Sequence, residues 1–190
     1  VSTDDEVAGT GTASFTVNAI GAITFGDTLN IDGVVDIDTT STIAITAAIS
    51  TNIGVTPNDA DHTIAIDATG TTTIAAAGTI NSAGAVTFGA AKTGTVTTSG
   101  DITTTNDTVT FTRSVTLGGP VAISTDTAVG NIVFSASLNS DNAVSTRDLT
   151  LTAGTGNIVF TGAVGTGASL EDILINSATD VTFSLAVTAE

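Results

Sequence analysis

The 190-residue chain lacks several residue types, and each absence excludes a class of site. It has no cysteine, so neither disulfide bonds nor thiolate metal sites are available. It has no tryptophan and no tyrosine, the residues that sugar-binding clefts use as stacking platforms. It has no apolar run of 18 residues, so the sequence predicts no membrane-spanning helix. A fold without these devices must be held by its backbone hydrogen bonds and its core.

Basic residues are also scarce. Lys92, Arg113 and Arg147 stand against 19 acidic residues, which gives a net charge of −16. Nucleic-acid binding requires clustered basic side chains that displace counterions from phosphates, so this function is excluded. Anionic membrane surfaces are disfavoured for the same reason. The acidity indicates a soluble, self-repelling chain, and divalent-cation binding at turns is the alternative interpretation.

The apolar residues that are present recur in short alternating segments. GNIVFT at 156–161 is nearly repeated as GNIVFS at 130–135, and weaker copies occur elsewhere. Apolar residues two apart, with small or polar residues between them, predict strands with one buried face. No segment shows a sustained 3.6-residue apolar period, so we expect almost no helix.

The strand copies recur every 20 to 26 residues, and this period predicts a repeat architecture. We interpret the chain as a right-handed parallel β-solenoid of about eight coils, most regular from 83 to 190. Each coil should carry at least two strands, with a third near Val96, Val115 and Val164. Tandem antiparallel β-sandwiches are the alternative fold. The predicted core ladder consists of Phe25, Ile45, Ile66, Phe88, Phe111, Phe134, Phe160 and Phe183.

The domain organisation follows from the same pattern. Residues 1–14 are acidic and then small and polar, which is typical of an arm or adaptor, and 15–190 form the solenoid. Neither end shows an evident cap, and in a copy that followed directly Phe15 would come 22 positions after Phe183. We therefore expect head-to-tail association through Phe15, Phe183 and Val187, or tandem repeats in a longer chain. The absence of methionine fits a removed signal segment or a piece of a longer protein.

The segment 148–164, DLTLTAGTGNIVFTGAV, resembles repeats of large secreted bacterial surface proteins, the filamentous-haemagglutinin-like and autotransporter-like adhesins. The segment 165–187 fits the same pattern. The resemblance covers 85–190 well and 15–84 weakly, and the family's N-terminal secretion motifs are not present. It implies a parallel β-helix, an extracellular or cell-surface location and a role as a stalk, filament or adhesive surface.

Catalytic patterns are weak. His62 is the only histidine, and no Gly-x-Ser-x-Gly motif accompanies it. Asp36 with Asp38, or Glu171 with Asp172, are the paired carboxylates that glycoside hydrolysis would need. Both pairs are more typical of a solvated face, so we expect no catalytic residues.

Calcium is the one cofactor that the sequence leaves open. Asn58, Asp59 and Asp61 could supply oxygen ligands, as could the acidic run 4–6, but neither cluster has the spacing of an EF-hand loop. Turn-stabilising side chains are the simpler interpretation.

The leading functional hypothesis is a non-enzymatic extracellular structural protein that stacks head to tail into a filament, stalk or surface layer. The alternatives are an adhesin segment that binds glycans or another cell surface, and, least favoured, a carbohydrate-active β-helix enzyme.

Overall fold

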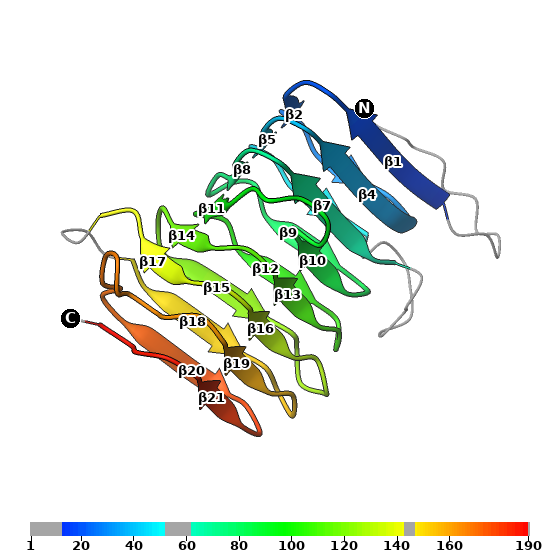
Figure 1. Ribbon diagram of the computed structural model, residues 1–190. Coiled ribbons are helices and arrows are strands. Elements are labelled where there is room, and N and C mark those ends of the chain that lie inside the picture. The colour runs from blue at the N-terminus through cyan, green and yellow to red at the C-terminus, as the bar shows by residue number, and fades with distance from the viewer. Residues whose placement is uncertain (1–12, 52–61, 143–146, 190) are drawn as a thin grey trace.

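The computed structural model describes residues 13–51, 62–142 and 147–189. These residues form a β-solenoid of about seven turns, built from three parallel sheets and containing no helix (Figure 1). The antiparallel alternative is wrong, because every strand pair is parallel. Accordingly, the described part holds no helix long and apolar enough to cross a membrane.

The three sheets are named here sheet A, sheet B and sheet C, and every complete coil passes through them in that order. Sheet A contains β1 (Ala13–Ala19), β4 (Gly33–Thr39), β7 (Ile64–Ala68), β10 (Val86–Phe88), β13 (Val109–Phe111), β16 (Ile132–Phe134), β19 (Ile158–Phe160) and β21 (Val181–Phe183). Sheet B contains β2 (Ile23–Phe25), β5 (Ile43–Ile45), β8 (Thr72–Ile74), β11 (Val96–Thr98), β14 (Val115–Leu117) and β17 (Leu138–Ser140). Sheet C contains β3 (Leu29–Asn30), β6 (Ile49–Ser50), β9 (Ile80–Ser82), β12 (Ile102–Thr104), β15 (Val121–Ser124), β18 (Leu149–Thr152) and β20 (Ile173–Ser177).

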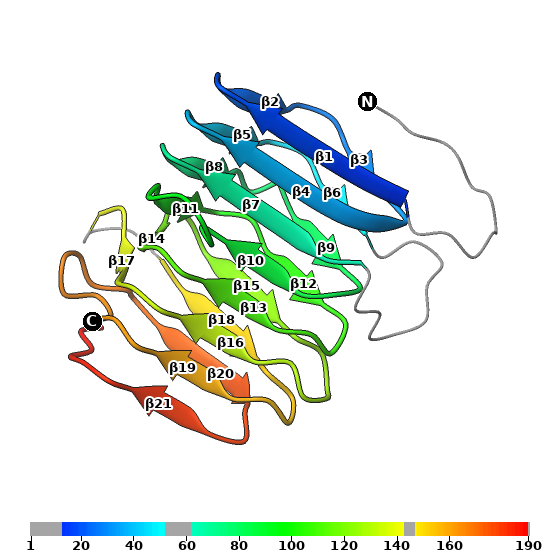
Figure 2. The same ribbon diagram turned by 45° about the vertical axis from the view of Figure 1, so that its right-hand side comes forward.

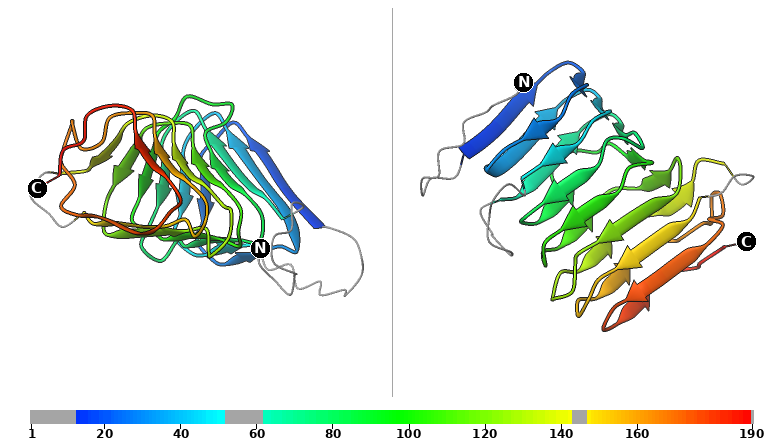
Figure 3. Two further views of the ribbon diagram at one scale, coloured as in Figure 1. Left: turned by 90° about the horizontal axis from the view of Figure 1, so that it is seen from below. Right: turned by 180° about the vertical axis from the view of Figure 1, so that it is seen from behind.

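The coils wind in one direction along the axis. In Figure 2, the strands of sheet A run from right to left in front and the chain returns behind them while it descends from the N-terminal to the C-terminal end. The view from behind in Figure 3 agrees. The solenoid is therefore right-handed, as most crossovers between parallel strands are.

The third strand of each coil was predicted near Val96, Val115 and Val164, and the structure confirms it. Val96 begins β11, and Val115 begins β14. Val164 forms isolated parallel bridges with Leu138 and Val187, which continue sheet B towards the C-terminal end.

The core consists of columns of inward-facing side chains, one per coil. The strands of sheet A alternate buried and less buried residues, so each coil contributes the same inward positions. In the longest column, consecutive phenylalanine rings stack nearly parallel, with centroids 4.6–5.0 Å apart. The register joins Ile66, Phe88, Phe111, Phe134, Phe160 and Phe183 into one column. This part of the predicted ladder is confirmed.

Phe25 and Ile45 do not belong to that column, so this part of the predicted ladder is wrong. Both lie in sheet B, where Phe25 is opposite Ile45 and Ile45 is opposite Ile74. In sheet A the partner of Ile66 is Ile37. The coil from Ile37 to Ile66 is 29 residues long, whereas the prediction divided this part of the chain evenly. The two-residue alternation identifies strands, but it cannot assign a strand to one side of a coil.

The glycine of the repeated hexapeptide is required by close approach between coils. A Cβ atom added at Gly156 would lie 2.0 Å from the carbonyl oxygen of Gly130, and one added at Gly130 would lie 2.6 Å from that of Asp107. The asparagine that follows joins neighbouring coils. The side-chain oxygen of Asn131 accepts a hydrogen bond from the backbone N–H of Asn157, at 2.7 Å. The repeat therefore encodes the contact between coils as well as the strand.

Candidate association surface

The C-terminal end of the solenoid exposes side chains that belong to core columns. Val181 and Phe183 are each 40% exposed, Leu185 is 60% exposed and Val187 is 43% exposed. One coil earlier, Ile158 and Phe160 occupy the columns of Val181 and Phe183 and are fully buried. We call Val181, Phe183, Leu185 and Val187 the C-terminal apolar face. It is exposed because no described coil covers it.

The backbone at this end is also open. β21 is the last strand of sheet A, so one of its edges has no neighbouring strand in the described part of the chain. Residues 181–189 contain no charged residue and no proline, the two devices that usually block pairing at a strand edge.

The N-terminal end of the described solenoid is built around β1. Phe15 and Val17 are half-buried on its inward side, while Thr16 between them is exposed. Phe15 packs edge-on against Phe25 of β2, with ring centroids 6.1 Å apart. The predicted association residues thus lie at opposite ends, with Phe15 at one end and Phe183 and Val187 at the other (Figure 2). Val181 and Leu185 were missed, although their spacing of two from Phe183 could have identified them.

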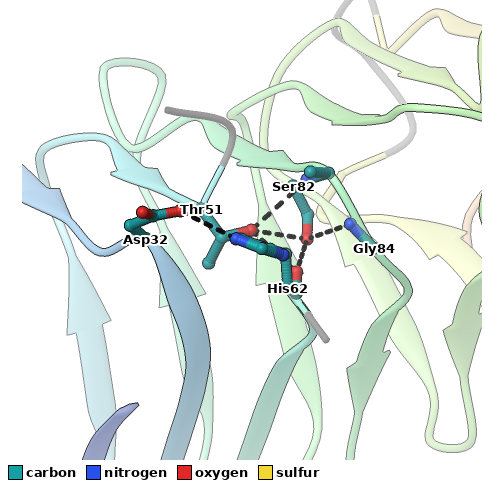
Figure 4. A network of polar contacts seen from close by, with 6 residues as sticks. Asp32, Thr51, His62, Ser82 and Gly84 are labelled. Carbon is teal, nitrogen blue, oxygen red and sulfur yellow. Dashed lines mark hydrogen bonds and ion pairs between the residues drawn. The ribbon is translucent and has the colours of Figure 1, made fainter. Parts of the chain in front are cut away.

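His62 lies in a polar network that joins three consecutive coils (Figure 4). Its ring Nε2 is 2.8 Å from Oδ1 of Asp32, and the residue is only 3% exposed. Its backbone carbonyl accepts hydrogen bonds from the hydroxyl groups of Thr51, at 2.8 Å, and Ser82, at 2.7 Å. Thr51 and His62 flank 52–61, so the network anchors both sides of that segment.

The network differs from a nucleophile–base arrangement. The Ser82 hydroxyl donates to the backbone carbonyl of His62, and Ser82 is completely buried. A serine nucleophile would instead donate to the ring and face a substrate. The geometry therefore supports a structural role for this part of the chain.

Three aspartates gather on the outer side of sheet A. Asp38 is opposite Asp67 in the neighbouring coil, and Asp36 lies two residues before Asp38. The pKa of Asp36 is raised above its usual value by partial burial and by the negative charges of Asp38 and Asp67. The Asp67 carboxylate accepts hydrogen bonds from the backbone N–H of Ala91, at 3.0 and 3.2 Å. Glu171 and Asp172 are exposed and lie just before β20, far along the chain from this group.

The predicted calcium ligands Asn58, Asp59 and Asp61 lie outside the described residues, as does 4–6. Within 13–51, 62–142 and 147–189, no group of three or more His, Asp or Glu side chains is arranged to hold a metal ion.

The basic residues are closer together than their spacing predicted. The Arg113 side chain donates through Nε to the backbone carbonyl of Lys92 in the previous coil, so these residues share one corner. Arg147 lies elsewhere and forms an ion pair with Asp141, with Nε 2.7 Å from Oδ1. The hydrogen bond from Arg147 lowers the pKa of Asp141.

Comparison of the chain with protein-family models, with curated proteins and with solved structures gives no match. The function is therefore argued from the geometry of the chain itself.

Proposed function

We propose that the chain is a non-enzymatic structural protein, a stiff β-solenoid that stacks head to tail into a filament, stalk or surface layer. The C-terminal apolar face carries this proposal. Exposed apolar groups that continue a buried column gain hydrophobic free energy when another coil covers them, roughly 1 kcal/mol for each large side chain at this exposure. Contiguous apolar patches on a soluble protein mark interaction sites.

The fold suits a mechanical role. About seven turns at ~4.8 Å per turn form a rod on the order of 34 Å long. Three ladders of backbone hydrogen bonds run along this axis, and the phenylalanine column fills the interior between them. Adding copies end to end would extend both the ladders and the core. An extracellular or cell-surface location is part of the proposal, and the resemblance of 148–164 to surface-protein repeats supports it.

The test compares two substitutions in the same strand. Phe183→Lys places a charge on the C-terminal apolar face, and Thr182→Lys places the same charge on the outer side of β21. Both lower the net negative charge equally, so a difference between them cannot arise from overall repulsion. We expect the natural chain and Thr182→Lys to form rods longer than one copy, seen by electron microscopy and sedimentation. Phe183→Lys should remain as single copies.

Circular dichroism should show that both variants remain folded, because the substituted residues lie in the last coil. Equal association of Phe183→Lys and the natural chain would refute the proposed contact surface.

A further inference from the structure

We propose that the C-terminal apolar face is covered by strand β1 of a second copy of this chain, with Phe183 over Val17 and Val181 over Phe15. This inference rests on the proposed end-to-end stacking, and it adds the partner strand and its register.

The columns at the C-terminal end are defined by the last strand pair of sheet A. Phe183 is opposite Phe160 and so continues the phenylalanine column. Val181 is opposite Ile158 and continues the neighbouring column of β-branched residues. A further coil must offer one inward side chain to each column.

The same two columns begin in β1 at the other end of the molecule. Val17 is opposite Ile37, and Ile37 is opposite Ile66, which leads into the phenylalanine column. Phe15 is opposite Val35 in the neighbouring column. A second copy that continues the register therefore brings Val17 to Phe183 and Phe15 to Val181. The pairing of Phe183 with Phe15, expected from the sequence spacing, would be out of register by two residues.

The side chains in this register are complementary in size. The large ring of Phe183 meets the small Val17, and the small Val181 meets the large ring of Phe15. Each facing pair thus combines one phenylalanine with one valine, so neither column is overfilled or left hollow.

The two strands are also free of charge. Residues 13–19 and 181–189 contain no acidic or basic residue, although the chain carries 19 acidic residues in total. β1 and β21 are the two outermost strands of sheet A, so each has an edge without a neighbouring strand among the described residues. A parallel pair between them would satisfy both backbone edges without burying a charge.

Sheet B independently favours the same alignment. Val187 ends the column that runs through Leu138 and Val164, and Ile23 begins that column at the N-terminal end. The register in sheet A therefore also brings Ile23 to Val187. A slip of two residues would move the rigid second copy about 6.6 Å along sheet A. Because the strands of sheet B run in a different direction, that slip would separate Ile23 from Val187.

Corners of unequal length do not prevent this join. In the C-terminal coil, Val187 follows Phe183 by four residues, whereas in the first coil Ile23 follows Val17 by six. The molecule already stacks a larger mismatch. Phe88 to Val96 spans eight residues and lies on Phe111 to Val115, which spans four.

The experiment uses the absence of cysteine in the chain. In the proposed register, the exposed Thr182 lies beside the exposed Thr16 of the second copy. Neighbouring strands are about 4.8 Å apart, which suits a disulfide, whereas positions offset by two residues are about 8 Å apart and do not. The single variants Thr182→Cys and Thr16→Cys are mixed as full chains and oxidised mildly with diamide. We expect a covalent dimer as the main product.

Matched mixtures test other arrangements. Thr182→Cys mixed with Ser14→Cys should give less than about a tenth of that dimer, because Ser14 would be aligned only if Phe183 lay over Phe15. A dominant product from this mixture would overturn the register. A dominant dimer of Thr182→Cys alone would mean that two C-terminal ends meet, and it would overturn β1 as the partner.

The remaining outcomes separate this inference from the proposed function. Association that is lost in Phe183→Lys, together with no cross-link between Thr182→Cys and Thr16→Cys, would refute the partner strand and leave end-to-end stacking intact. Absence of any association of the natural chain would refute both.

Discussion

At the scale of single residues, the surroundings decide what each aspartate contributes. Asp36 lies beside two other carboxylates and its pKa is raised. Asp141 accepts a hydrogen bond from an arginine and its pKa is lowered. Asp67 is 8% exposed and is satisfied by a backbone N–H of the next coil. Composition showed only that the chain is acidic, whereas the stacking of coils determines which charges repel.

The raised pKa of Asp36 leads to a prediction about pH. Above its usual value of 3.8, the folded state holds the Asp36 proton more tightly than the unfolded state. The stability that this provides is fully present below pH 3.8 and is lost as the pH rises through the raised pKa. Asp36→Asn should therefore stabilise the protein at pH 7, by about 0.5 kcal/mol or less because the side chain is partly solvated. The gain should shrink towards pH 3.

Urea unfolding at pH 7 and pH 3 measures this effect. The control is Asp126→Asn, since Asp126 is exposed and has a left-handed backbone that asparagine also tolerates. A gain of the same size at both pH values, or a loss at pH 7, would contradict the role assigned to Asp36.

A second prediction concerns the network around His62. Thr51→Val keeps the shape of the side chain but removes the hydroxyl that donates to the carbonyl of His62 and contacts Ser82. Because the site is fully buried, we expect a loss of about 1–3 kcal/mol in the free energy of unfolding. Thr97→Val is the control, because Thr97 lies on the outer side of β11. Equal effects of the two substitutions would argue against the network.

At the scale of elements, short strands depend on contacts at the corners. Most strands have only two to four residues, so little of their stability can be local. Buried hydroxyl groups turn the chain between strands: Thr98 donates to the carbonyl of Gly100 and Thr125 to that of Gly130. Glycine at the start of the hexapeptide allows the coils to approach. These features were visible in the sequence as repeated letters, but their cause is contact between coils.

The glycine requirement can be tested with a matched pair. Gly156→Ala should destabilise the fold by about 3 kcal/mol or more, because the added Cβ would collide with the backbone of Gly130. Gly26→Ala should be neutral or slightly stabilising, since a Cβ there meets nothing within 4 Å and alanine restricts the unfolded chain. Thermal unfolding compares the two. A harmless Gly156→Ala would show that the coils are spaced more widely than described.

At the scale of the whole molecule, attraction at the ends opposes repulsion between the bodies. Each copy carries a net charge of −16, while the ends proposed to meet are uncharged over 13–19 and 181–189. Stacking brings the acidic bodies of two copies close together, so screening of their charges should favour it.

We therefore expect rods to lengthen with ionic strength. Sedimentation at about 10 mM and about 500 mM NaCl should show more association at the higher concentration, where the Debye length falls to only a few ångströms. Calcium and magnesium chloride at matched ionic strength should act alike if screening is the cause. A response to calcium alone would instead assign a ligand role to acidic residues such as Asp59 and Asp61.

The sequence by itself determined the strands, the faces they bury and the period of the repeat. These features depend on neighbouring residues, since alternation places Val109 and Phe111 on one side of a strand whatever that strand pairs with. Only the tertiary structure decided which sheet each strand joins. Phe25 and Ile45 have the same alternation as Ile37 and Ile66, but coil length separates them into different columns. The spacing likewise favoured Phe15 as the counterpart of Phe183, whereas hydrogen-bonded register leads from Phe183 to Val17. Register depends on backbone pairing across whole coils, and no local pattern carries that information.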